Sequence, residues 1–133
     1  MTAATGNSTT TSAAPVAAPG DRGQGAMTLA ELGRWAGRQS TRLAAKFDLG
    51  DSEQDRAFIL LAQAAKLGEE AGELQREVLG FVRYQRAEKL DGFTQQSAAD
   101  EIADVIICAA ILAARMGVDV EDAVRQKVAR VSL

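Results

Sequence analysis

The chain has 133 residues, of which 47% are hydrophobic and 5% aromatic, and its formal net charge is −3. This length suits one domain, and the prominence of Ala, Leu and Val with only two prolines favours helices over sheet. The acidic balance provides no basic field for nucleic acid, so binding to duplex DNA or RNA is not expected.

The chain contains no histidine. This excludes the usual general base, the commonest zinc ligand, every Ser-His or Cys-His catalytic pair, and the Glu-x-x-His motif of di-iron helical bundles. The single cysteine, Cys108, cannot form an internal disulfide, which fits a reducing cytoplasm, and its apolar surroundings predict a buried small hydrophobe. Any metal would be held by carboxylate oxygens, which points to magnesium, with manganese as the alternative.

Residues 1–26 consist mainly of Ala, Thr, Ser, Gly and Pro and contain almost no large apolar side chain. Such a segment cannot bury enough surface to offset its ordering entropy, so we expect a disordered tail before a folded domain at 27–133. No basic start leads into an apolar run, so the tail does not resemble a signal peptide.

Two N-terminal signatures predict the first two helices. Thr28 with Glu31 forms a capping-box pattern for a helix that runs to about Lys46. Ser52, followed three residues later by an acidic residue, predicts the start of a long second helix that ends near Arg86.

Three aromatic residues accompany these two helices. Trp35, Phe47 and Phe58 are expected to lie in the core, and stacking on a nucleobase is the alternative role.

The C-terminal half predicts two more helices. A loop is expected at 90–96, and Ser97 with Asp100 resembles the capped start of a third helix that ends near Gly117. Asp119 begins a fourth helix by the same criterion. No stretch alternates as a strand does, so the predicted fold class is all-α with four helices.

The third helix contains a long apolar run with one charge. Between Ile102 and Ala114 the only charged residue is Asp104. The run is too short to span a membrane, so we expect a core helix. A buried carboxylate in such a run requires a salt-bridge partner or a metal, because an unpaired buried charge is costly.

Two pairs of carboxylates carry the strongest chemical signal. Glu70 and Glu73 lie three residues apart, as do Glu101 and Asp104. Residues at i and i+3 share a helix face, so two packed helices could gather all four carboxylates around one small volume. Such a cluster implies a cation, because four unneutralised carboxylates repel one another. On spacing alone, an ordinary solvated acidic face remains the alternative.

The second helix places several charged residues together. At about 100° per residue, one narrow stripe beside its apolar face contains Lys66, Glu70, Glu73 and Glu77. Glu69 lies farther round, towards solvent.

The two acidic pairs resemble the signature of a known family. E-x-x-E followed by E-x-x-D is typical of the MazG-like, all-α nucleotide pyrophosphohydrolases. KLGEEAGEL resembles the first motif of this family, and EIADVIICAAILAARMGVDVEDAVRQK resembles its second motif with the helix and lysine that follow. The resemblance covers roughly Met27 to the end of the chain.

The resemblance implies a four-helix MazG-like bundle that assembles into a homodimer or homotetramer, with sites that can combine residues from two chains. It implies magnesium-dependent hydrolysis of a nucleoside triphosphate between the α and β phosphates, giving a monophosphate and pyrophosphate. A role in clearing non-standard or excess nucleotides would follow. The rival function is a non-catalytic helical interaction module or nucleotide-binding regulator with the same fold.

By the same resemblance, magnesium would be bound by Glu70, Glu73, Glu101 and Asp104. The phosphates would contact Lys66, Lys127 and Arg130, although Lys127 and Arg130 also fit a basic patch at a helix C-terminus. Glu70 or Glu69 would orient the attacking water and accept its proton.

The last helix departs from the family pattern. Many relatives have an asparagine shortly after the lysine, where this chain has Ala129 or Val131 depending on alignment. Relatives often continue with further basic residues beyond the position of Leu133, so the last helix is expected to be short or completed by a neighbouring subunit.

Overall fold

The computed structural model describes residues 25–82 and 93–132, and these residues form helices and their connections without any strand. The helices are α1 (Leu29–Lys46), α2 (Glu53–Phe81), α3 (Gln95–Arg115) and α4 (Val120–Val131). The all-α prediction is therefore confirmed for the described part of the chain. The predicted tail lies almost entirely outside it.

The N-termini of α1 and α2 follow the predicted caps. The Thr28 hydroxyl accepts from the Glu31 N–H at 3.2 Å, and the Glu31 carboxylate accepts from the Thr28 N–H at 2.7 Å. Ser52 caps α2 through its own hydroxyl. α2 ends at Phe81, earlier than predicted, and the expected end near Arg86 lies outside the described residues.

The start of α3 differs from the prediction. The N-cap is Thr94, and Ser97 is the third helical residue, whose N–H donates to the Thr94 hydroxyl at 2.9 Å. Both residue types cap helices well, so the sequence pattern did not reveal that the cap lay one turn earlier. At the other end, Gly117 has a φ of 69°, which suits glycine, and Asp119 caps α4 as predicted.

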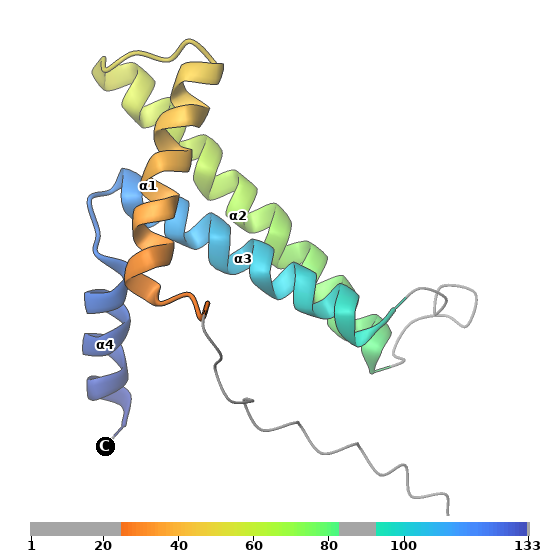
Figure 1. Cartoon of the computed structure of the whole chain (residues 1–133). Helices are drawn as coiled ribbons and strands as arrows, with labels where there is room; N and C mark the ends of the chain where they lie inside the picture. The colour runs from red at the N-terminus through yellow and green to blue at the C-terminus, as the bar shows by residue number, and fades with distance from the viewer. Residues whose placement is uncertain (1–24, 83–92, 133) are drawn as a thin grey trace, which may run out of the picture.

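α2 and α3 lie side by side as a long antiparallel pair (Figure 1), and this is the most extensive helix contact of the described chain. α1 crosses the C-terminal end of α3, and α4 packs chiefly against α1. The apolar core lies at this end, where Leu32 and Ala36 of α1 meet Ala110 and Ile111 of α3. We call it the core end.

Much apolar surface remains uncovered in the single chain. Trp35 packs against the core as predicted, but Phe47 and Phe58 are 64% and 61% exposed, so their predicted core position is wrong within one chain. Ile102 and Ile106 on α3 are also exposed. α3 is therefore buried along one stripe only.

Candidate metal centre

Three carboxylates from the two long helices converge. Glu70 of α2 and Glu101 and Asp104 of α3 each offer one oxygen, and these oxygens all lie within 4.8 Å of one another. The convergence follows from the antiparallel pairing of α2 with α3 and from the i, i+3 spacing on α3. We call these three residues the acidic cluster.

Burial within the acidic cluster differs from the expectation. Glu70 is buried, with 6% of its surface exposed, whereas Asp104 is exposed. Asp104 follows Glu101 by three residues, which at about 100° per residue turns it roughly 60° away around the helix. The expectation of a buried Asp104 was therefore wrong, and Glu70 is the carboxylate that the fold removes from water.

Glu101 provides a test of whether a cation fits. Its Oε2 atom is buried and has no hydrogen-bond partner. Burial raises the pKa of this carboxyl, and the charges of Glu73, Glu70, Asp104 and Glu77 raise it further. A buried oxygen without a donor, surrounded by negative charge, suits a hard cation that prefers oxygen ligands.

Lys66 neutralises part of the acidic cluster. Its ammonium lies 2.6 Å from the Glu70 carboxylate and 3.2 Å from that of Glu69, and these contacts raise the pKa of the lysine. The side chain of Glu69 is 58% exposed, in agreement with its predicted direction towards solvent. Within about one turn, α2 thus carries the ammonium of Lys66, the buried carboxylate of Glu70 and the exposed carboxylate of Glu69.

Two residues near the cluster have different roles. Glu73 is not among the three closely spaced carboxylates, although its charge raises the pKa of Glu101, so its metal-binding role stays a prediction. Cys108 is buried, and burial followed by the charge of Glu70 raises the pKa of its thiol. A protonated, buried thiol matches the predicted small hydrophobe rather than a nucleophile.

The predicted phosphate ligands of the last helix lie elsewhere in this chain. Lys127 and Arg130 are exposed on α4, which packs against α1 and the end of α3 (Figure 1). The described chain therefore brings Lys66 to the acidic cluster but not these two residues.

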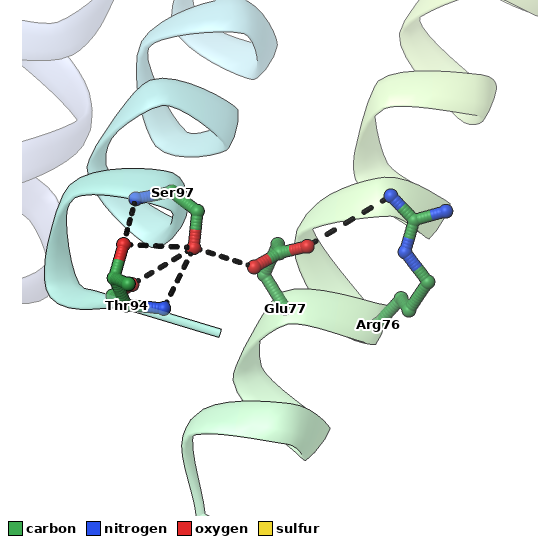
Figure 2. A network of polar contacts seen from close by, with 4 residues as sticks. All are labelled: Arg76, Glu77, Thr94 and Ser97. Atoms are coloured by element: carbon green, nitrogen blue, oxygen red, sulfur yellow. Dashed lines mark hydrogen bonds and ion pairs between the residues drawn. The ribbon is translucent and has the colours of Figure 1, made fainter. Parts of the chain in front are cut away.

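Glu77 and Ser97 were not predicted as parts of the site. The Ser97 hydroxyl donates to Glu77 Oε2 at 2.8 Å and so joins α3 to α2 (Figure 2). On α3 this contact lies about one turn before Glu101. The sequence had placed Glu77 on the same stripe as Glu70, but Ser97 carried only a capping signal. The sequence did not predict this pairing, because it joins residues from two separate helices.

An apolar cavity of about 210 Å³ lies between the end of α1 and the start of α2. Phe47 and Phe58 line it, and Gln63 is its one polar lining residue. Gln63 precedes Glu70 by seven residues, so the cavity lies about 10 Å along the helix from the acidic cluster.

Comparison with known proteins agrees with the two motifs. Residues 69–131 match the model of the MazG-like family, a range that contains both acidic pairs. This match supports the assignment of residues 69–131, from the second half of α2 to the end of α4, to the MazG-like family and agrees with the recognition drawn from the motifs. It does not extend to α1 or the start of α2, which the resemblance had also covered. No curated protein and no solved structure gives a significant match to the chain. Among the described residues, none of the helices has the length and apolar character needed to cross a membrane.

Proposed function

We propose that this protein is a magnesium-dependent nucleoside triphosphate pyrophosphohydrolase. It would cleave between the α and β phosphates and release a nucleoside monophosphate and pyrophosphate. One observation carries the proposal: the acidic cluster, with its partnerless buried Glu101 oxygen, is formed by the two motifs that the MazG-like family model covers.

The residues present fit a divalent cation. Glu70, Glu101 and Asp104 would hold it, with Glu73 as a further ligand, and manganese could replace magnesium because all the donors are oxygens. The bound ion would neutralise phosphate charge and lower the pKa of a water molecule, so no histidine base is required.

The chain's own residues supply the remaining chemistry. Glu69, exposed beside Glu70, would orient the attacking water and accept its proton, with Glu70 as the alternative acceptor. Lys66 would contact the phosphates and stabilise charge on the departing pyrophosphate, because its ammonium already lies next to the acidic cluster.

The nucleoside end would extend along α2 towards the apolar cavity. Phe47 and Phe58 offer ring faces there, and the Gln63 amide offers both a donor and an acceptor to a base edge. The separation of about 10 Å along the helix suits a nucleoside whose phosphates lie at the acidic cluster.

We also propose that the active form is a homodimer or homotetramer in the cytoplasm. The exposed apolar side chains on α2 and α3, such as Leu61 at 72% and Ile106 at 48%, would be covered by a second copy. Lys127 and Arg130 would then reach the phosphates of a neighbouring subunit. Clearance of non-standard or excess nucleotides is the corresponding physiological role.

The discriminating experiment measures pyrophosphate release from a panel of nucleoside triphosphates with Mg²⁺. We expect release by the wild-type protein and its loss in Glu73→Gln and Asp104→Asn, while circular dichroism shows the helices intact. If the wild type binds Mg²⁺ and nucleotide but releases no pyrophosphate from any member of the panel, the protein is a binding module instead.

Assembly is tested by mixing two inactive variants, Glu73→Gln and Lys127→Ala. If one site combines residues of two chains, the mixture regains part of the activity, because some sites receive both intact halves. Light scattering should give the mass of a dimer or tetramer. A monomer with full activity would contradict the assembly proposal.

A further inference from the structure

The contact between Glu77 and Ser97 joins the two helices that carry the acidic cluster. Glu77 is 8% exposed, and its Oε2 accepts from the Ser97 hydroxyl at 2.8 Å (Figure 2). The Ser97 hydroxyl has one proton, and the charged carboxylate is a nearer acceptor than the Thr94 carbonyl at 3.0 Å. Ser97 also accepts from the Thr94 N–H at 2.9 Å. The same hydroxyl therefore belongs to the cap of α3 and to the contact with α2.

The position of this contact matters for the acidic cluster. Ser97 precedes Glu101 by four residues, about one helical turn, and Glu77 follows Glu70 by seven residues, about two turns. Each partner therefore lies on the same helix as a cluster residue and close to it along the chain. The charge of Glu77 contributes to the raised pKa of Glu101, which places the two carboxyls in the same electrostatic environment. If one helix shifted along the other, this hydrogen bond would break and Glu101 would move away from Glu70 at the same time.

A purely structural role explains the contact poorly. A helix cap requires only Thr94 and Ser97, and an apolar residue at position 77 would cover α3 without burying charge. Instead, the fold buries a further carboxylate beside an already acidic site. The other oxygen of this carboxylate, Glu77 Oε1, lies 3.8 Å from the Arg76 guanidinium, which is a long contact for an ion pair. Charge burial of this kind is costly and suits a residue that specifies one arrangement of its surroundings.

We infer that Glu77 is a positioning residue, which through Ser97 fixes the register of α3 against α2 and thereby holds Glu101 opposite Glu70 for cation binding. Glu77 itself is not among the three closely spaced carboxylate ligands. The inference rests on the metal site of the proposed function and concerns how that site is held together.

The test is a titration of the full chain with Mn²⁺ alone, followed by electron paramagnetic resonance, in the absence of nucleotide. Ser97→Ala and Glu77→Ala should each weaken Mn²⁺ binding about tenfold. The double variant should lose no more Mn²⁺ affinity than the more affected single variant, because both substitutions remove the same contact. Glu77→Gln keeps an acceptor oxygen and should stay within about twofold of wild type.

Thr94→Ala is the matched control. It removes the cap of the same helix and should lower the melting temperature, but it leaves the contact between Ser97 and Glu77 in place. Its Mn²⁺ affinity should therefore stay within about twofold of wild type. If Glu77→Ala does not fold, Ser97→Ala and Glu77→Gln decide the test.

Three results would overturn the inference: unchanged Mn²⁺ affinity in Ser97→Ala, an equal loss in Thr94→Ala, or no Mn²⁺ binding by the wild type. The failure of the proposed function has a separate signature. A wild type that binds Mn²⁺ but releases no pyrophosphate disproves the enzyme while the affinity ratios still support the positioning role.

Discussion

The core end and the acidic cluster are built on opposite principles. At the core end, Leu32 and Ala36 of α1 pack against Ala110 and Ile111 of α3, and apolar burial stabilises the contact. At the acidic cluster, Glu70 and Glu101 face each other, and Lys66 is the cation that the described residues bring to Glu70. Apolar burial stabilises the core end, whereas the like charges of the acidic cluster repel one another.

This difference separates stability from function. Hydrophobic contacts at the core end join α1 to α3 away from the acidic cluster, so the cluster can be electrostatically unfavourable without unfolding the chain. The hydrogen bond between Ser97 and Glu77 is the one specific polar link between α2 and α3 that the structure shows near the cluster within the described residues. Substitutions at the core end and in the acidic cluster should therefore change different measurements.

The largest effect is expected from Glu101→Gln. The loss of a ligand should lower the rate of pyrophosphate release by roughly 10³-fold, equivalent to about 4 kcal/mol of transition-state stabilisation. Without divalent cations the variant should melt above wild type, because one repelling charge is gone. Mg²⁺ should raise the melting temperature of wild type only. A variant that keeps its activity would remove Glu101 from the site.

Ile111→Ala is expected to destabilise the core end. Truncation of this buried side chain should cost about 2–5 kcal/mol of unfolding free energy, measured by urea denaturation. At a temperature where the variant is folded, its Mn²⁺ affinity should match wild type, because Ile111 lies outside the acidic cluster. A parallel loss of metal affinity would show that the core end and the acidic cluster are coupled.

Gly80→Ala tests how closely the far end of the pair is packed. A Cβ at this position would lie 2.2 Å from ring atoms of Phe93, so the ring must move, at a cost of about 1–3 kcal/mol. Gly68→Ala is the control, because a Cβ there meets nothing within 4 Å. It should gain about 0.5–1 kcal/mol from helix propensity. Equal melting temperatures for the two variants would contradict the close contact.

The smallest effect concerns pH in the absence of divalent cations. The pKa of Glu101 is raised above its ordinary value of 4.5 in the folded state. At pH values between 4.5 and this raised pKa, the folded state therefore binds more protons than the unfolded state. The melting temperature should therefore fall as pH rises from 4.5 through the raised pKa. In Glu101→Gln the melting temperature should depend less on pH. A wild-type melting temperature that rises over the same pH interval would contradict the expected direction.

Local features of the fold were readable from the sequence. The capping box of Thr28 with Glu31 and the cap at Asp119 depend on neighbours three residues away, so the pattern itself contains the interaction. The same locality explains why the pairing of Glu101 with Asp104 was predicted. The direction of Glu69 towards solvent followed from the helical angle alone.

The sequence therefore determined the four described helices, apart from the start of α3, and the acidic pairs. Only the tertiary structure decided that Glu70 is buried while Asp104 is exposed, that Glu77 meets Ser97, and that α4 keeps Lys127 away from the acidic cluster within one chain. These features depend on how far each helix is rotated and shifted against its neighbour. Helical periodicity fixes which residues share a face, but the packing of whole side-chain surfaces fixes which faces meet.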